Sequence, residues 1–396
     1  MTIKQFVHNV RQQFNATLAS SLKTTHIYEL IAAAFGYNSY AALQADAILL
    51  HQTPWPCLLQ SAQLAQRARE LGLVEPQAIS PLLEQCLLSA GVVCIRVEML
   101  GFSDEINLMN HIVWEHDWQD DEGDSWGDDW PKHDERKPLS IATQTAQALS
   151  QLLDGPLDTS IVQQALQQLE AFAERGHPEI HWKLAQLYWD DWNDEEYLEK
   201  TDIGTGYWYQ KQQEGMELKG PELEFANEFA TILHKQAQWR HHALKAAQGG
   251  NIEASYALAE HNLDNSIFDA NPALVSNPAA IGQLANELDN EAAAHYWYTQ
   301  AALRGNINAM RVLIEQYDNP NLYQSWVWLL LAQLFDTDLT QDDFRAINEY
   351  GEAYDDDIDG TMFIDGSKGI TLAPLAPQLA IEAEQEAQHL FALCNQ

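Results

Sequence analysis

The sequence predicts a mainly α-helical protein: an α-solenoid of helix hairpins, with an N-terminal helical region and a small β-hairpin element. Three observations support this prediction. Apolar residues recur at helical spacing over most of the chain, and glycines interrupt the helical stretches. Four lines of the later sequence share one order of residue types, which indicates a repeat.

Residues 1–53 are predicted to form an N-terminal helical module. The first helix has one apolar face, made by Ile3, Phe6, Val7, Val10, Phe14 and Leu18. A second helix is expected to stop at Gly36, because glycine readily takes the left-handed conformation that ends helices. Asn38 or Ser39 can then cap a third helix that runs through Ala47.

Residues 54–113 are predicted to form helices followed by a β-hairpin. The helices end at Gly72 and Gly91. Beyond them, apolar residues alternate with their neighbours in two runs: Val93, Ile95, Val97 and Met99, then Ile106, Leu108, Ile112 and Trp114. A period of two is typical of strands, and the sequence GFSDE between the runs suits a turn. The alternation therefore predicts a hairpin from about 92 to 114.

The charge balance restricts the partners that the chain can have. Acidic residues number 58 and basic residues 21, which gives a formal net charge of −37. Such a chain repels a phosphate backbone and an anionic membrane surface, so neither nucleic acid nor membrane is an expected partner. It attracts basic proteins or cations. The alternative is that the charge serves only solubility.

Other features indicate a cytoplasmic location. Cys57, Cys86, Cys94 and Cys394 form no C-x-x-C pair, which favours four buried thiols in a reducing compartment over zinc or disulfides. The first 14 residues have the spacing of an amphipathic helix and no continuous apolar region, unlike a secretory signal. The longest apolar run is far shorter than the roughly 20 residues that span a bilayer.

Residues 114–137 are predicted to form an acidic, tryptophan-rich loop. Like charges at the density found in this segment disfavour a compact fold. One interpretation is a docking strip whose carboxylates steer a basic partner while its tryptophans anchor the contact. The candidate residues are Trp118, Asp120, Asp121, Glu122, Asp124, Trp126, Asp128, Asp129 and Trp130. A variant of this reading is mimicry of nucleic-acid charge. The alternative is a solvated loop whose tryptophans fold back onto the body.

Residues 138–345 are predicted to form helical repeats. Four lines, which begin at Leu169, Tyr207, His241 and His295, have an aromatic start, small residues, a glycine turn and a second helix. Alanines let antiparallel helices approach closely, and glycine permits the positive φ that ends the first helix. One hairpin cannot bury its own apolar face, so several must stack. The irregular spacing of the glycines implies two insertions.

The third and fourth lines carry a more specific pattern. Its residues are Ala246, Gly250, Ala254 and Leu258 in the third line, and Trp297, Tyr298, Ala301, Gly305, Ala309, Leu313 and Tyr317 in the fourth. This pattern resembles the Sel-one-like repeat, a tetratricopeptide relative, over about residues 165–340. The resemblance implies a concave surface that holds other proteins, and it implies neither catalytic residues nor a cofactor. Some bacterial members of that family are linked to secretion systems, toxin immunity or envelope processes.

Histidines and tryptophans in the repeats have structural explanations. His241 and His242 are adjacent, so they point to different faces of a helix and do not easily chelate one ion. His177 and His181 lie four residues apart without the H-E-x-x-H order of a zinc protease. Four tryptophans at repeat positions are expected to fill the interhelical core rather than line a ligand groove; they are Trp208, Trp239, Trp297 and Trp326.

Residues 346–396 are predicted to hold an acidic turn or hairpin and a C-terminal helix. Three alternating aspartates before a glycine copy the opening of a calcium loop, D-x-D-x-D-G; they are Asp355, Asp357 and Asp359. The glutamate that completes such a loop is missing, since its position is Gly366. The alternative is a turn that leads into a β-hairpin, with bends at Gly366 and Gly369.

These features together predict a non-enzymatic scaffold, adaptor or inhibitor. It would bind a basic protein through its repeat surface and acidic insertion. A toxin-neutralising immunity protein is a specialised form of the same hypothesis. The hypothesis of another class is an enzyme or weak calcium-binding protein that uses the three aspartates. The chain contains no P-loop, zinc deaminase pair or dinucleotide fingerprint.

Overall fold

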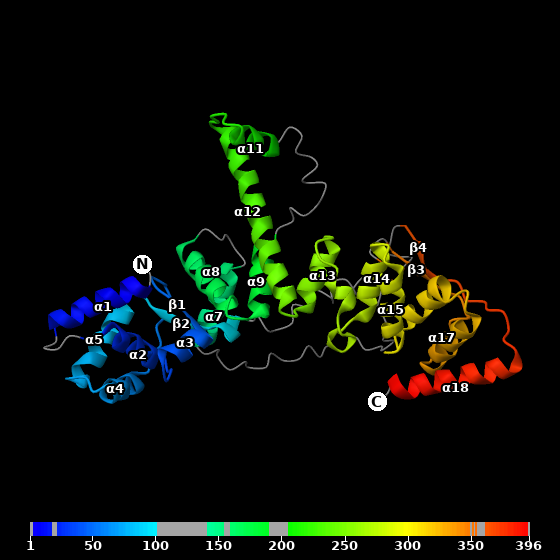
Figure 1. Cartoon of the computed structure of the whole chain (residues 1–396), viewed down its shortest axis with the longest axis horizontal. Helices are drawn as coiled ribbons and strands as arrows, with labels where there is room; N and C mark the ends of the chain where they lie inside the picture. The colour runs from blue at the N-terminus through cyan, green and yellow to red at the C-terminus, as the bar shows by residue number, and fades with distance from the viewer. Residues whose placement is uncertain are drawn as a thin grey trace. The chain divides into compact units, whose positions relative to one another are not determined.

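The computed structural model describes residues 3–17, 22–100, 141–153, 159–189, 205–348, 351, 353–354 and 361–394. These residues are mainly helical, as the sequence predicts, with two small antiparallel strand pairs (Figure 1). They divide into two compact units, with the boundary between Asn251 and Ile252. Within these ranges no helix is both long enough and apolar enough to cross a bilayer.

Five helices open the first unit: α1 (Ile3–Thr17), α2 (Thr24–Ala34), α3 (Tyr40–Asp46), α4 (Ser61–Glu70) and α5 (Pro76–Ser89). Their apolar faces meet in one core, to which α1 contributes Phe6, Val7, Val10 and Phe14. Gly36, after α2, has a φ of 88°, and the Ser39 hydroxyl caps α3 by accepting from the amide of Ala42. The predicted helix end at Gly36 and the predicted cap at Ser39 are therefore both confirmed.

A two-stranded sheet follows from residues far apart in the chain. β1 (Ala47–Leu50) pairs antiparallel with β2 (Val93–Arg96), so that Leu49 lies opposite Cys94. The alternation correctly predicts a strand at β2, but β1 is its partner among the described residues. The expected continuation is also wrong, because Val97–Leu100 is a 3-10 helix, η1. The other half of the predicted hairpin, 106–114, lies outside the described residues.

β1 is buried on both faces of the sheet, and β2 is buried on the face that holds Val93 and Ile95. Ile48, Leu50, Val93 and Ile95 belong to a core shared with α7 (Ile141–Leu153), α8 (Ser160–Ala173) and α9 (Pro178–Tyr188). Leu49 belongs instead to the core of the N-terminal helices, and Cys94 packs against that core. Because both faces of β1 are covered, its sequence AILL shows no alternation, which is why the period-two pattern does not reveal it.

The rest of the first unit is a helical hairpin with one very long arm. α11 (Thr205–Gln213) is followed by α12 (Pro221–Gln248), a continuous helix of 28 residues, or about 42 Å. The repeat pattern predicts two separate helices here, one from the second line and one from the third. That prediction is wrong, because no glycine or proline interrupts the chain between Pro221 and Gly249. α11 packs on the N-terminal half of α12, and α9 packs on its C-terminal half (Figure 1).

The second unit is a series of short helices. They are α13 (Ile252–Glu260), η4 (Ser266–Asp269), η5 (Pro272–Leu274), α14 (Pro278–Glu287), α15 (Glu291–Ala302), α16 (Ile307–Val312), the π-helix η6 (Leu313–Tyr317) and α17 (Leu322–Leu334). Trp297 is fully buried, and its indole donates to the carbonyl of Phe268 at 3.1 Å. Gly305 has a φ of 86° and forms the predicted turn before α16.

Asparagine caps mark four consecutive helices of this unit. The side chains of Asn277, Asn290, Asn306 and Asn321 accept hydrogen bonds from the amide three residues later, at 2.8 to 3.3 Å. Each bond satisfies one of the free amides at a helix start and stabilises it by about 1 kcal/mol. The starts of α14 to α17 are therefore fixed locally, by the sequence.

The second unit ends with a strand pair and a helix. β3 (Asp343–Ile347) pairs antiparallel with β4 (Phe363–Ser367), and α18 (Pro377–Cys394) packs on α17. A hairpin is found in this region, but Gly366 is not at its bend. It lies within β4 opposite Phe344, with a φ of 111°, where an added Cβ would overlap the carbonyl oxygen of Asp343. The close approach of the two strands explains the glycine.

Candidate functional site

Both stretches that the sequence singles out fall outside the residues that the structure describes. The first contains Trp118, Asp120, Asp121, Glu122, Asp124, Trp126, Asp128, Asp129 and Trp130. The second contains Asp355, Asp357 and Asp359. Within the described ranges, no group of three or more histidine, cysteine, aspartate or glutamate side chains is placed to hold a metal ion.

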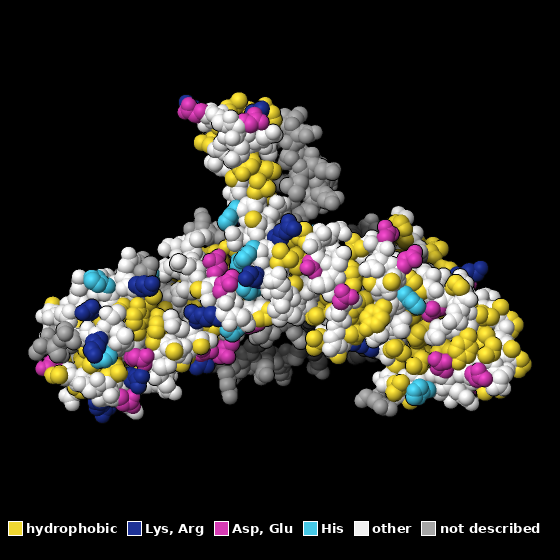
Figure 2. Space-filling model, in the orientation of Figure 1, with side chains coloured by type: hydrophobic (Ala, Val, Ile, Leu, Met, Phe, Trp, Pro, Cys, Tyr) yellow, Lys and Arg dark blue, Asp and Glu magenta, His cyan; other side chains and the backbone are white. Residues whose placement is uncertain are grey.

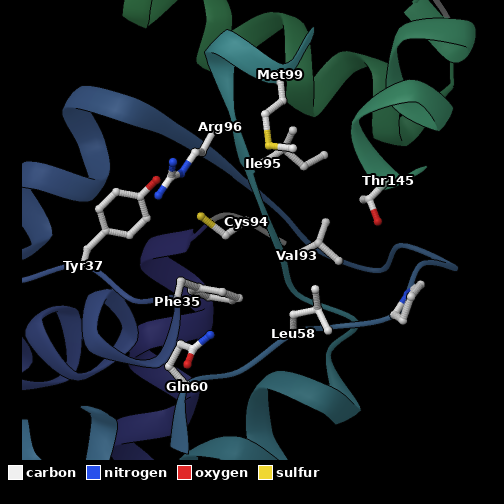
Figure 3. A pocket seen from close by; sticks show the side chains of 11 residues that line it. Phe35, Tyr37, Leu58, Gln60, Val93, Cys94, Ile95, Arg96, Met99 and Thr145 are labelled. Atoms are coloured by element: carbon white, nitrogen blue, oxygen red, sulfur yellow. The ribbon is translucent and has the colours of Figure 1, made fainter. Parts of the chain in front are cut away.

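A groove of about 180 Å³ runs along β2 in the first unit (Figure 3). Its floor is the whole strand, Val93–Arg96, and its walls come from η1, α7 and the segment between β1 and α4. The lining residues are Phe35, Tyr37, Pro56, Leu58, Gln60, Val93, Cys94, Ile95, Arg96, Met99 and Thr145. Figure 3 shows Cys94 and Arg96 on one side of the strand, with Val93 and Ile95 on the other.

The two outer edges of this sheet differ in how their backbone groups are hydrogen-bonded. On the outer edge of β1, the amide of Gln168 donates to the carbonyl of Leu49 at 2.6 Å and accepts from its N–H at 2.9 Å. Gln164, one helical turn earlier on α8, makes the same two bonds to His51, at 3.5 and 3.3 Å. Two side chains thus take the place of a neighbouring strand and satisfy the backbone groups of β1.

The outer edge of β2 faces the groove. Leu49 uses its N–H and C=O on Gln168, so the residue opposite it, Cys94, directs its own N–H and C=O away from β1. Arg96, two residues on, has the same orientation. No backbone hydrogen bond from either residue to another described residue is found on this side. Among the residues that the structure describes, β2 therefore has no backbone partner on the edge at the floor of the groove.

Charged groups gather at one end of the groove. The Arg96 guanidinium lies 3.5 Å from an Asp46 oxygen, 3.3 Å from Glu98, and 6.0 Å from the centre of the Tyr37 ring. The Tyr37 hydroxyl donates to Asp46 at 2.5 Å; burial and this bond raise the pKa of the phenol. Burial also raises the pKa of the Cys94 thiol, to about 12, so the thiol stays protonated at neutral pH and is a poor nucleophile.

A buried histidine pair joins α9 to α12. His181 and His242 are almost fully buried, and their Nδ1 atoms lie 3.0 Å apart. One ring must donate and the other accept, so the accepting ring is neutral and the two rings cannot both be charged. The Nε2 atom of His242 has no partner among the described residues, which favours a proton on its Nδ1. The Tyr188 ring stacks on His242 at 6.0 Å.

The surroundings of this pair keep it uncharged. Burial lowers the pKa of both rings, to about 4 for His242, where the two neighbouring histidines add to the effect. The charged side chains near the pair are Glu174, Glu179, His241 and Lys245, and Glu174 lies within 4.0 Å of both His241 and Lys245. The sequence correctly predicts that the adjacent His241 and His242 point to different faces of the helix, since His242 is buried and His241 is exposed. It does not reveal that His181 meets His242, because they are 61 residues apart.

A polar cluster in the second unit surrounds the π-helix. The buried Asp318 carboxylate accepts from His295 Nε2 at 3.1 Å and from the Trp328 indole at 2.7 Å. Tyr317 stacks on His295, and its hydroxyl donates to Asn286. Although an Asp–His pair can activate a hydroxyl, the nearby Tyr317 hydroxyl is committed to Asn286. These bonds tie α14, α15 and α17 together.

Comparison with known proteins gives no further identification: no family model, no curated protein and no solved structure matches the chain.

Proposed function

We propose that this protein is a non-enzymatic, acidic helical scaffold that binds a basic protein. We also propose that one docking surface is the tip of the α11–α12 hairpin, by which we mean residues 205–230. The observation that carries the proposal is the composition of that tip. Exposed apolar side chains, Tyr207, Met216 and Phe225, stand among glutamates. We further propose that the helix hairpins stack in the manner of the Sel-one-like repeats that the third and fourth lines resemble.

The apolar part of the tip would supply the contact energy. Tyr207, Met216 and Phe225 are 43%, 49% and 44% exposed, while Trp239 further along α12 is 3% exposed. Figure 2 shows apolar side chains on this part of the molecule with acidic side chains beside them. Aromatic and methionine side chains are over-represented at the centres of protein interfaces.

The charged part would select the partner. Residues 205–230 contain five glutamates, Glu214, Glu217, Glu222, Glu224 and Glu228, against two lysines. Lys211 and Lys219 are already paired with Glu214 and Glu217, at 2.7 and 3.4 Å. The excess of glutamates over lysines makes the tip negative, like the chain as a whole with its net charge of −37. Both the long-range field of the protein and the local surface of the tip therefore favour a cationic partner.

Affinity capture at two salt concentrations tests the proposal. The full chain is immobilised and exposed to a lysate of its source organism at about 50 and 300 mM salt, and the retained proteins are identified by mass spectrometry. Retention of a basic protein that weakens with salt is expected, because the Debye length falls from about 14 to 6 Å. The double variant Glu222→Lys, Glu224→Lys should lose that protein.

The matched control is Glu382→Lys with Glu384→Lys on α18. It makes the same charge change at the same spacing on another exposed helix surface. Equal loss of the partner in both variants would mean that only net charge matters and that the tip is not the docking surface. Retention that does not depend on salt would contradict the choice of a basic partner.

A further inference from the structure

We infer that the groove along β2 accepts an extended segment of the partner protein, which adds to the sheet as a third strand. The backbone edge at Cys94 and Arg96, which has no partner in the described part of the chain and lies at the floor of a cavity lined by β2, points to this occupant. The strand pairing rests on that geometry alone. The expectation that the segment is basic rests on the proposed function.

The chemistry of the floor determines what can cover it. A strand edge presents donors and acceptors in alternation, and another strand matches that pattern at every second residue. On the β1 side the same need is met within the protein, by Gln164 and Gln168. On the β2 side, no hydrogen bond from a described side chain to the backbone of Cys94 or Arg96 is found. The incoming backbone would bond to Cys94 and Arg96.

The walls determine which side chains suit the segment. An added strand directs alternate side chains to the two sides of the sheet. One side holds Val93, Ile95 and Met99, which favour an apolar residue. The other side holds Arg96, which lines the groove; Asp46 and Glu98 lie behind it, at 3.5 and 3.3 Å from its guanidinium, and give this end one net negative charge. An extended peptide with alternating apolar and basic residues therefore fits the groove.

The probe is a heptapeptide of alternating valine and lysine with blocked termini, added to the full chain labelled with [15N]cysteine. The chain has four cysteines, so the spectrum has four amide signals, and Cys94→Ser assigns the one in β2. Cys86, within α5, is the internal reference. Saturating peptide should slow amide exchange at Cys94 by about tenfold or more and leave Cys86 unchanged.

Two controls separate strand pairing from attraction of charge. The same peptide with alternate backbone amides methylated keeps its charge and composition but cannot pair, and it should leave Cys94 exchange unchanged. Arg96→Pro and Arg96→Ala both remove the guanidinium, but only proline removes the outward N–H. Proline is tolerated at such an edge position. Arg96→Pro should bind the peptide about tenfold more weakly than Arg96→Ala, which corresponds to one lost hydrogen bond.

Two results would overturn strand pairing, and a third would overturn the preference for a basic segment. Equal binding of the methylated peptide would mean that charge alone attracts it. Slow exchange at Cys94 without peptide would mean that residues of the chain itself, such as 106–114, already cover the edge. A glutamate version of the peptide that binds equally well would remove the preference for a basic segment. Failure here with continued salt-dependent capture of a basic protein would refute the groove and leave the proposed function standing.

Discussion

The two halves of α12 have the same helical backbone but different surroundings. Trp239, His242, Ala243 and Ala246 are buried in the C-terminal half, where α9 covers the helix. In the N-terminal half only Ala226 is buried, and Phe225 beside it is 44% exposed. One half therefore contributes to the core of the unit, and the other presents side chains to solvent on a rigid support.

The difference explains how a helix of this length persists. Helices gain most of their stability from packing an apolar face rather than from propensity. The C-terminal half has that packing, and the N-terminal half continues the same hydrogen-bond ladder with α11 as its neighbour. Changes in the C-terminal half should therefore destabilise the protein, whereas changes in the N-terminal half should alter binding.

Replacement of Trp239 by alanine should have the largest effect on stability. Trp239 is 3% exposed and lies 5.3 Å from the Trp189 ring, so the variant leaves a large cavity between α9 and α12. The expected loss is about 3–5 kcal/mol of unfolding free energy, measured by urea denaturation followed by circular dichroism. A loss below about 1 kcal/mol would show that α9 and α12 are not tightly packed.

Acidification should lower the unfolding free energy of the protein, because it protonates a histidine that is buried in the C-terminal half of α12. The pKa of His242 lies near 4 in the folded chain against 6.5 in the unfolded one, so below pH 6.5 the unfolded chain binds protons more readily. Stability should be full above about pH 6.5 and fall by up to about 3 kcal/mol by pH 4, as measured by urea denaturation across that range.

The variant His242→Phe should flatten this pH dependence, because it removes the titrating ring. His241→Gln is the matched control, as His241 is its exposed neighbour on the same helix, and it should keep most of the pH dependence of the parent, because burial is the main cause of the lowered pKa of His242. A profile that is unchanged in His242→Phe would assign the acid sensitivity to other groups.

The replacement Gly249→Ala should have an intermediate effect. A Cβ at Gly249 would lie 2.5 Å from the Cβ of Pro178 at the start of α9, closer than van der Waals contact. The two helix ends would have to separate, at a cost of about 1–3 kcal/mol in thermal or urea denaturation. The neighbouring exposed change Gln248→Ala should cost less than about 0.5 kcal/mol. Equal stability of the two variants would contradict close contact between these ends.

The change Phe225→Ala should have the smallest effect on stability. Phe225 is 44% exposed, so its removal should alter the unfolding free energy by no more than about 0.5 kcal/mol. The same variant should weaken capture of the basic partner, since the ring is one of the proposed contact residues. A large loss of stability would show that Phe225 belongs to the core, and the comparison between the halves of α12 would then fail.

Local signals in the sequence predict much of the helical structure. The apolar face of α1, the turn at Gly36, the Ser39 cap and the turn at Gly305 can all be read from neighbouring residues. Of the four tryptophans expected in the core, Trp239 and Trp297 are buried, whereas Trp208 and Trp326 are only partly buried. These features depend on residues within about one or two helical turns, which is why spacing and residue type suffice.

Features that join distant segments were not predictable in this way. β2 was expected to pair with the residues that follow it, but β1 precedes it by more than 40 residues. The Gln168 side chain that bonds to Leu49 is 119 residues from it. A glutamine on a helix has no pattern that distinguishes this role from solvent exposure. The groove along β2 was missed for the same reason.

Residue type and short-range spacing are enough to predict the helical composition, the strongly negative charge and several helix ends, such as those at Gly36, Gly72 and Gly305. Only the folded chain shows which strand pairs with β2, which edge of it has no partner among the described residues, and which half of α12 is buried. Each of those outcomes depends on packing and hydrogen bonds between segments that meet only when the chain folds.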